Sequence, residues 1–518
     1  MATITLSTEE YDALVAERDS LGKLLKTVTV ERDLLKEKLA AHLRKLFDAK
    51  SEARGTEQKD MFLNEAEALA PTPESPAAAE VEPEEIEVAG HTRKKRGRKP
   101  LDPNLPRDIV RHELPESERV CAHDGSMLVE IGVEISEQLD IIPQQVRVTQ
   151  HHRVKYACPC CDQGIKVTPA PARIIPKGLL TESALAWVVT SKYMDALPLY
   201  RQAALLGRFG GDLSRTTLAA SIIRVGNAVQ PIINLLRDHL LDADLVHADE
   251  TTIQVLKEPG KKAQTKSYLW AQASGTGPPI RLFGYAPGRG SSHAETLYAG
   301  MKRGAALMSD GYDVYGRVAK IGELTHLGCW AHCRRYFVEA EALIPKAARS
   351  SEQPATQFIA AIGELYAVES RARNLNDVRD RHRLREQHSR PVLKKIEQLL
   401  LHHLHAVVPG SLLGKALHYL AAQWPKLIRY VDNGAWPIDN NLCENAIRPF
   451  VVGRRNWLFA DTPAGAHASA NLYSLVETCK ANSIDPYAYL VSLFRKLPAA
   501  QSADDFEALL PWHLPIAR

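Results

Sequence analysis

Residues 245–256 read LVHADETTIQVL, an apolar stretch that predicts a buried β-strand carrying Asp249. The elements predicted after it are, in chain order, strands at 268–273 and 280–285, a short helix at 292–301, strands at 306–308 and 324–329, and a helix from residue 331. This is the order that a ribonuclease-H-like α/β sheet requires. It places a first carboxylate, Asp249, on the first strand and a second, Asp310, just after the fourth.

The two aspartates indicate a metal-dependent reaction. Carboxylates at the ends of neighbouring strands cannot both stay ionised cheaply when they lie close together, and a bound divalent cation resolves their repulsion. Carboxylate oxygens suit Mg²⁺, which keeps several waters and takes phosphate oxygens as further ligands. Two such ions, roughly 3.5–4 Å apart, activate an attacking oxygen and stabilise a leaving one. We therefore expect a third carboxylate on a later helix.

Glu444 is the candidate for this third carboxylate, within PIDNNLCENAIRP at residues 437–449. The Asp-Asn-Asn run is a helix-start signal, so Glu444 is expected in the first turn, where the helix dipole favours a negative side chain. Arg448 is then one turn along on the same face. The alternative third ligand is Glu477, which is one helical turn from Lys480 and could form a supporting pair with it.

The separation of 444 − 310 = 134 residues between the second and third carboxylates is long for this fold. Residues 345–430 are rich in Ala, Leu, Arg and Glu with helical period, and we interpret them as a helical insertion. The catalytic domain then covers residues 243–482, and a helical tail covers 483–518.

The composition excludes several classes of protein. With 518 residues, of which 45% are hydrophobic and 25% charged, the chain is typical of a folded multidomain protein and not of a disordered, collagen-like or membrane-embedded one. It contains no run of 18 apolar residues, and its first residues lack the basic-then-apolar order of a signal peptide. We therefore expect a cytoplasmic protein without a membrane partner.

Residues 1–50 predict a coiled-coil helix that begins near residue 7. Four apolar residues recur every seven positions: Leu14, Leu21, Val28 and Leu35. Such a repeat is typical of a left-handed coiled coil, although two arginines interrupt the neighbouring seam. We expect this helix to bring two copies of the chain together; the alternative is a lone amphipathic helix packed on its own protein.

Residues 51–109 predict a disordered linker that contains a basic arm. Six Glu and three Pro lie between residues 73 and 87, and no aromatic residue lies between 63 and 100. The arm RKKRGRKP at 93–100 resembles an AT-hook, because Gly97 permits close backbone approach to a narrow A·T minor groove. The alternative is a solvated tether with affinity for phosphates alone. Its candidate DNA-binding residues are Arg93, Lys94, Arg96, Arg98 and Lys99.

Residues 110–175 have the spacing of a zinc-finger-like β module. Cys158 and Cys161 form one C-x-x-C knuckle, with Cys160 as an alternative to Cys161. The second knuckle is Cys121 with His123 or Asp124, since no Cys lies three residues after Cys121. Alternating apolar residues between the knuckles predict a β-ribbon. The alternative is a metal-free module with incidental thiols.

Residues 176–242 predict a helical bundle with a helix-turn-helix arrangement. Helices are expected at 181–192 and 197–207, and Ser214 caps a third that runs to residue 239. Arg215, at the start of the third helix, is a candidate DNA contact. Any helical bundle shares this pattern. Together the segments predict a multidomain α+β protein.

The sequence resembles the transposases of insertion-sequence family 66. The likeness rests on HADETTIQV, MSDGYDVYGRV, GCWAHCRRYF and the stretch IDNNLCENAIRPFVVGRRNWLFADTPAGAHASANLYSLVETCKAN, and it covers nearly the whole chain. The resemblance implies a DDE-type DNA transposase in which Asp249, Asp310 and Glu444 fall on the acidic triad. The family's knuckle module usually has a second C-x-x-C where this chain has Cys121-Ala-His-Asp124.

The implied reaction is phosphoryl transfer. Metal-activated water frees a 3′-hydroxyl at the element end, and this hydroxyl attacks a target phosphodiester in line. The implied partners are double-stranded DNA at the element ends and target, a second copy of the chain, and small accessory proteins. The implied metals are two Mg²⁺, for which Mn²⁺ substitutes, and a structural zinc. The implied location is the bacterial nucleoid.

Several basic residues near the triad are candidate phosphate contacts, with ordinary surface charge as the alternative for each: Arg334, Arg335, Arg448, Arg454, Arg455 and Lys480. Trp457 could stack on a splayed base, but a core position is favoured. Cys329, His332 and Cys333 could bind a metal by spacing, but a packed helix start is favoured.

Two other functions stay open from the sequence. The chain could be a DNA-binding protein with a vestigial triad, or a structure-specific nuclease that cuts without joining strands.

Overall fold

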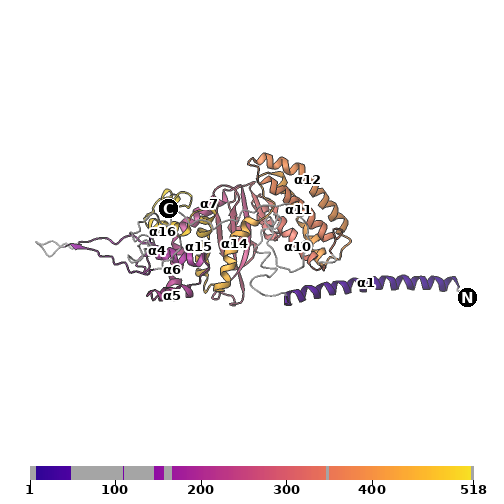
Figure 1. Ribbon diagram of the computed structural model, residues 1–518, viewed down its shortest axis with the longest axis horizontal. Coiled ribbons are helices and arrows are strands. Elements are labelled where there is room, and N and C mark those ends of the chain that lie inside the picture. Colours follow the sequence, from indigo (N-terminus) through magenta and orange to yellow (C-terminus); the bar gives the residue numbers. More distant parts are fainter. Residues whose placement is uncertain (1–6, 48–108, 110–144, 157–165, 346–348, 515–518) are drawn as a thin grey trace, which may run out of the picture. The chain divides into compact units, whose positions relative to one another are not determined.

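The computed structural model describes residues 7–47, 109, 145–156, 166–345 and 349–514. The chain divides into two compact units, one formed by Met1–Thr72 with Gln150–Arg518 and the other by Pro73–Thr149. Almost all of the described residues belong to the first unit, and the fold below is the fold of that unit (Figure 1).

Helix α1 (Thr8–Phe47) confirms the predicted N-terminal helix. Its apolar series at seven-residue intervals lies between 52% and 63% exposed: Leu14, Leu21, Val28 and Leu35. A coiled-coil partner buries a stripe of this kind. Pairing of two copies through this helix stays a prediction.

A five-stranded mixed sheet forms the centre of the unit, in the order β5-β4-β3-β6-β7. Strand β3 is the middle strand; it pairs antiparallel with β4, which pairs antiparallel with β5, whereas β6 and β7 run parallel to it. The strands are β3 (Leu245–Gln254), β4 (Lys266–Ser274), β5 (Arg281–Ala286), β6 (Ala306–Ser309) and β7 (Thr325–Gly328). All five predicted strands are therefore confirmed, within a few residues at their ends.

Two helices carry the connections to the parallel strands. Helix α8 (Ser291–Tyr298) was predicted, and it leads from β5 to β6. Helix α9 (Asp313–Ile321) connects β6 to β7 and was not predicted. A crossover is obligatory here, because two parallel neighbours cannot be joined by a hairpin.

The predicted third helix of the N-terminal bundle is wrong, because it is two helices. Helix α6 (Arg215–Ala228) ends at Val229, and α7 (Gln230–Leu241) starts at an angle of 49° to it. Pro231 explains the break, since proline has no N–H to continue the helical ladder. The earlier helices α4 (Glu182–Tyr193) and α5 (Leu199–Arg208) are confirmed, and Ser214 caps α6 by accepting from the Thr217 N–H.

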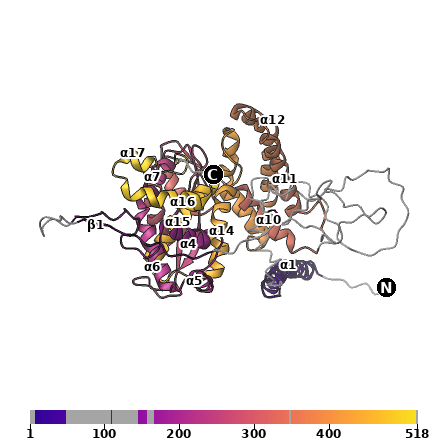
Figure 2. The same ribbon diagram turned by 60° about the vertical axis from the view of Figure 1, so that its left-hand side comes forward.

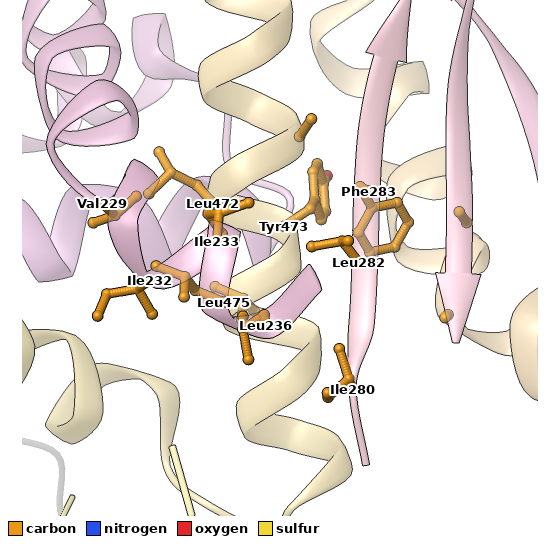
Figure 3. Packing of buried hydrophobic residues seen from close by; sticks show 14 of the residues in the cluster. Val229, Ile232, Ile233, Leu236, Ile280, Leu282, Phe283, Leu472, Tyr473 and Leu475 are labelled. Carbon is orange, nitrogen blue, oxygen red and sulfur yellow. The ribbon is translucent and has the colours of Figure 1, made fainter. Parts of the chain in front are cut away.

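Helix α15 (Pro463–Ala481) joins this bundle to the sheet. Figure 3 shows Leu472 and Leu475 of α15 beside Ile233 and Leu236 of α7, while Tyr473 faces strand β5. Side-chain hydrogen bonds fix both faces: the Phe283 N–H of β5 donates to Ser474 Oγ at 2.8 Å, and Asn471 Nδ2 donates to the Gly226 carbonyl at 2.9 Å.

The long segment between the second and third carboxylates is helical, as predicted. Helices α11 (Pro354–Ala372), α12 (Val378–His403) and α13 (Leu412–Leu427) pack with α10 (Trp330–Ala342) around a second hydrophobic cluster (Figure 2). A buried bidentate ion pair joins α12 to α11, with Arg385 Nη2 2.7 Å from Glu369 Oε2. A buried pair of this kind needs such satisfied geometry to be tolerated.

The remaining elements complete the chain order. They are α14 (Asn441–Trp457), α16 (Pro486–Lys496), α17 (Ala503–Glu507) and the short 3-10 helices η3 (Ile428–Asp432) and η4 (Leu497–Ala499). No single helix in the described ranges has the length and apolar character needed to cross a membrane, although α6 and α7 would pass that test if joined as one bent pair.

The zinc-finger-like module lies mostly outside the described residues. Strands β1 (Lys155–Tyr156) and β2 (Lys166–Val167) form an antiparallel pair, and residues 145–154 of the predicted ribbon form no strand. The rest of the predicted ribbon, up to residue 144, lies outside the described residues. The candidate ligands Cys121, His123, Asp124, Cys158, Cys160 and Cys161, and the basic arm at 93–100, also lie outside the described residues.

Close packing of α6 on α15 predicts a large effect of one methyl group. A Cβ at Gly226 would lie 2.5 Å from Ala468 Cβ and 2.6 Å from Ala468 Cα. Gly226→Ala is therefore expected to lower the free energy of unfolding by about 1–3 kcal/mol through overpacking. Urea denaturation followed by circular dichroism measures it.

Gly363→Ala in α11 is the matched control, because nothing lies within 4 Å of its added Cβ. It should raise stability by about 0.5–1 kcal/mol through helix propensity. Equal effects of the two substitutions would contradict the close approach of α6 and α15.

Candidate active site

Three carboxylates come from three separate elements. Asp249 lies on β3, Asp310 follows the last residue of β6, and Glu444 lies in the first turn of α14, as the helix-start signal predicted. The parallel register pairs His247 of β3 with Met308 of β6, so Asp249 and Asp310, each two residues further on, lie at the same edge of the sheet.

The neighbouring carboxylates act on the charge of Asp249. The pKa of Asp249 is raised well above its usual value, first by burial and then by the nearby carboxylates of Glu444, Glu250 and Asp310. No cation is among the groups that shift it most. The Glu250 N–H donates to Asp249 Oδ1 at 2.8 Å, and the Tyr312 N–H donates to Asp310 Oδ1 at 3.0 Å. Backbone donors thus orient the two aspartates without neutralising their charge.

Asn440 fixes the start of α14 against the sheet, a role that the Asp-Asn-Asn helix-start signal did not predict. Its side chain is fully buried: Oδ1 lies 2.9 Å from His247 Nδ1, and Nδ2 donates to the Ala248 carbonyl at 2.9 Å. Its backbone N–H donates to Cys329 Sγ at 3.3 Å. The amide therefore joins β3, one residue before Asp249, to the helix that carries Glu444.

Glu444 lies beside the start of α10. Its Oε1 is 3.5 Å from His332 Nδ1, and its Oε2 is 3.7 Å from Arg335 Nη2. One ligand atom each of Cys329, His332 and Glu444 lies within 4.8 Å of the others, which is close enough to hold a metal ion. Burial raises the pKa of the Cys329 thiol well above its usual value, so the thiol stays protonated at neutral pH.

Cys329 and Cys333 are both buried, in agreement with the packed helix start that the sequence favoured. Cys333 packs in the second hydrophobic cluster and is not one of the three grouped ligands. The proximity of His332 to Glu444 was missed, because the contact joins residues 112 positions apart (444 − 332 = 112). The sequence predicted only Arg448 as a neighbour of Glu444, one helical turn along the same face.

Glu250 supports the second carboxylate from the opposite face of β3. Its carboxylate accepts from the Tyr315 hydroxyl of α9 and pairs with Arg289 at 2.5 Å. Arg289 lies over the Tyr312 ring at 3.8 Å, and Tyr312 holds Asp310 through its backbone. No local pattern predicts this chain of contacts, since alternation along the strand directs Glu250 away from Asp249.

Glu477 takes part in a different site. It pairs with Lys480 at 2.8 Å, as the spacing predicted, and Arg281 of β5 also interacts with it. Neither Glu477 nor Lys480 is among the groups that shift the pKa of Asp249 most. Lys480 is thus a partner of Glu477, which leaves its ammonium less available to phosphate.

The other predicted contacts are distributed along the surface of the unit. Arg334 and Arg335 lie half-buried on α10, Arg448 and Arg454 lie half-buried on α14, Arg455 is exposed on α14, and Arg215 is exposed on α6. The Arg454 guanidinium donates to two oxygens of Thr252 on β3, the backbone carbonyl and the side-chain hydroxyl. Trp457 is partly buried and packs against the main core beside Tyr473, which agrees with the favoured packing role.

Comparison with known families identifies the same segments. The family model described as Transposase IS66 family matches residues 177–468, which include the three carboxylates, and the IS66 C-terminal element matches 474–512. A zinc-finger binding domain of transposase IS66 matches 118–162, which contain both predicted knuckles, and the model described as Transposase C of IS166 homeodomain matches 34–110.

Two proteins of Sinorhizobium fredii (strain NBRC 101917 / NGR234) are similar over most of their length. Uncharacterized protein y4qI is 33% identical over 452 residues, covering 84% of this chain and 81% of the relative. Uncharacterized protein y4jD is 31% identical over 425 residues, covering 79% and 81%.

The raised pKa of Asp249 predicts a pH dependence of stability in magnesium-free buffer. Its folded pKa exceeds its unfolded value, so the folded state keeps a proton that the unfolded state has lost, and stability falls as pH rises through that window. Asp439, whose pKa burial raises to about 6, adds to the same slope up to that pH. Asp249→Asn should flatten the slope and raise the apparent Tm near pH 7 by roughly 2–4 °C.

Thermal unfolding between pH 4 and 8 measures this slope. Asp461→Asn is the control, because Asp461 forms an exposed pair with Lys257 and should leave the slope unchanged. A parental slope in Asp249→Asn would show that the pKa of Asp249 is not raised in the folded state.

The buried amide of Asn440 predicts a stability loss on truncation. Asn440→Ala leaves His247 Nδ1 and the Ala248 carbonyl without their partner, and we expect a loss of about 2–4 kcal/mol in urea denaturation. Asn456→Ala, which removes one exposed hydrogen bond to the Ala196 carbonyl, should change stability by less than about 0.5 kcal/mol. Similar losses in both variants would contradict the role of Asn440.

Proposed function

The chain belongs to the Transposase IS66 family, and on this premise we propose that it is a DDE-type DNA transposase that cleaves the ends of an insertion sequence and joins them to target DNA. The observation that supports this most is that Asp249 lies at the same sheet edge as Asp310, and that the carboxylates of Asp310 and Glu444, from two other elements, both contribute to its raised pKa after burial. The strand order, with three antiparallel strands followed by two parallel ones, supports a ribonuclease-H-like catalytic domain.

The donor set fits Mg²⁺. It consists of hard carboxylate oxygens. Burial, and after it the repulsion of neighbouring carboxylates, raises the pKa of Asp249, and a divalent cation would remove that repulsion. When bound to Asp249, Asp310 and Glu444, two Mg²⁺ ions supply activation of the attacking oxygen and stabilisation of the leaving one, and Mn²⁺ is expected to substitute.

The chain's own residues orient the reacting groups. The Tyr312 N–H and the Glu250 N–H hold the two aspartates, and Asn440 sets the start of α14 relative to Asp249. Preorganised groups of this kind lower the barrier by positioning, and no covalent enzyme intermediate is needed.

Cationic side chains near Glu444 are proposed to receive the phosphates of the DNA strand. Arg335 is already close to Glu444, and Arg334 and Arg448 lie on the same two helices. Guanidinium groups suit phosphate because they donate two parallel hydrogen bonds.

The outlying segments are proposed to bind DNA and to assemble the active species. The zinc-finger match over 118–162 supports a structural zinc in the predicted knuckles, and the uncovered apolar stripe of α1 supports a dimer. The basic arm at 93–100 and the α5–α6 pair with Arg215 are proposed as further DNA contacts. Small accessory proteins of the same element are proposed as partners.

Strand transfer by the purified protein tests the catalytic assignment. With duplexes carrying the terminal inverted repeats that flank the coding region, we expect Mg²⁺-dependent cleavage and joining. Asp249→Asn, Asp310→Asn and Glu444→Gln should each reduce the rate by roughly 10²–10³-fold or more. Glu477→Gln should keep the parental rate, because Glu477 pairs with Lys480 away from Asp249.

Each alternative has its own outcome in this assay. Activity of Glu444→Gln together with loss in Glu477→Gln would move the third ligand to Glu477. Cleavage without joining would indicate a nuclease, and binding of the ends with neither step would indicate a DNA-binding protein without catalysis.

A further inference from the structure

Helix α14 ends in a strained turn that exposes two apolar side chains. Leu458 has φ 66° and ψ −50°, and the Phe459 N–H donates to the Trp457 carbonyl at 2.8 Å. This is a three-residue γ-turn of the rare kind with positive φ, which is costly for a residue with a side chain. Leu458 is nonetheless 62% exposed and Phe459 43% exposed, so burial of these side chains does not offset the strain.

The segments on both sides hold the turn in this conformation. Before it, Trp457 lies so close to Gly453 that a Cβ there would be 2.0 Å from the indole ring, and Lys192 lies 4.3 Å from the centre of that ring. After it, the Ala460 N–H donates to the Gln254 carbonyl of β3 at 2.9 Å. The strain is therefore imposed by the fold, and strain of this kind gathers at functional sites.

A basic groove adjoins the turn. It has a volume of ≈ 500 Å³. Its lining residues are Thr252, Ile253, Gln254, Gln264, Thr265, Lys266, Arg454, Arg455 and Leu458. Three of these side chains are cationic and none is acidic, and Arg455 and Lys266 are exposed and form no ion pair with any residue that the structure describes. Unpaired cations at the edge of a groove suit a phosphate backbone.

We propose that Leu458 and Phe459 form a wedge that enters a base step of the DNA, while Arg454, Arg455 and Lys266 hold the phosphates beside it. Apolar wedges next to cations are a known way to unstack and bend a duplex. The proposal rests on the proposed transposase function and describes a second contact with the same DNA, at a distance from the bond that is cleaved. Trp457, which the sequence suggested for stacking, is packed in the core, and the exposed pair follows it directly.

The geometry of α14 predicts where the wedge enters. Glu444 and Leu458 are 14 residues apart (458 − 444 = 14). At about 1.5 Å per residue this is about 21 Å along the helix. It corresponds to about six base pairs at about 3.4 Å each. With the duplex lying along α14, as we propose, the unstacked step is expected about six base pairs from the bond that is cleaved.

Fluorescence of 2-aminopurine placed at successive positions of the inverted-repeat duplex tests the proposal. The full-length protein with Asp249→Asn is used, so that the DNA stays intact. We expect a several-fold rise at one step about six base pairs from the cleaved bond. Leu458→Ala combined with Phe459→Ala should abolish the rise and weaken binding about 10-fold. Ile321→Ala, which removes an equally exposed side chain of α9, should change neither.

Two further variants separate the wedge from folding and from simple charge. Leu458→Gly should raise the unfolding temperature, because glycine adopts positive φ without strain, yet reduce the fluorescence rise. Arg455→Ala with Lys266→Ala should lower the slope of log affinity against log salt by about 1–2.

The outcomes distinguish the wedge from the function on which it rests. Bound duplex with no fluorescence rise at any position, or with the same rise in the Leu458 and Phe459 double variant, overturns the wedge and leaves the transposase proposal intact. Failure of the parent protein to bind the repeats or to transfer strands overturns the proposed function, and the wedge with it.

Discussion

A single buried amide holds together the parts of the molecule on which the site depends. Asn440 has no exposed surface, and both polar atoms of its side chain form hydrogen bonds to β3, Oδ1 with His247 Nδ1 and Nδ2 with the Ala248 carbonyl. Since a buried amide without partners is costly, α14 cannot slide or rotate against the sheet without losing both contacts. The position of Glu444 relative to Asp249 is therefore set by hydrogen bonding. Apolar packing alone would fix the register of α14 against β3 less specifically.

The same junction concentrates unfavourable charge. Asp249 is close enough to three other carboxylates for them to raise its pKa, and no cation is prominent among its neighbours. Two hydrophobic clusters, one around the sheet and bundle and one around α10 to α13, supply the stability that allows this. Clusters of like charges that the rest of the fold stabilises are typical of functional sites. Binding of a cation at such a site removes the repulsion between the carboxylates.

Local sequence patterns predicted the strands and the start of α14, whereas the contacts that assemble the site depend on residues far apart in the sequence. All five strands and the start of α14 followed from apolar runs and from the Asp-Asn-Asn signal, because these depend on neighbouring residues. The break at Val229 was missed although Pro231 is visible in the sequence, since the apolar period continues across it. The contacts of Asn440 and of His332 join residues more than a hundred positions apart, and no periodicity encodes such pairs.

Helix α14 contacts strand β3 at successive points along its length, and this explains why the carboxylates and the basic groove have a fixed spacing. At one end, Asn440 binds Ala248; further along, Arg454 donates to Thr252; and beyond the helix, Ala460 binds Gln254. With contacts at its start, near its end and just after it, the helix can neither bend away nor shift in register. The strain at Leu458 follows from this, because the chain must leave a helix and meet the strand within three residues. A relaxed turn would need a longer connection, and the exposed pair would then lose its fixed distance from Glu444.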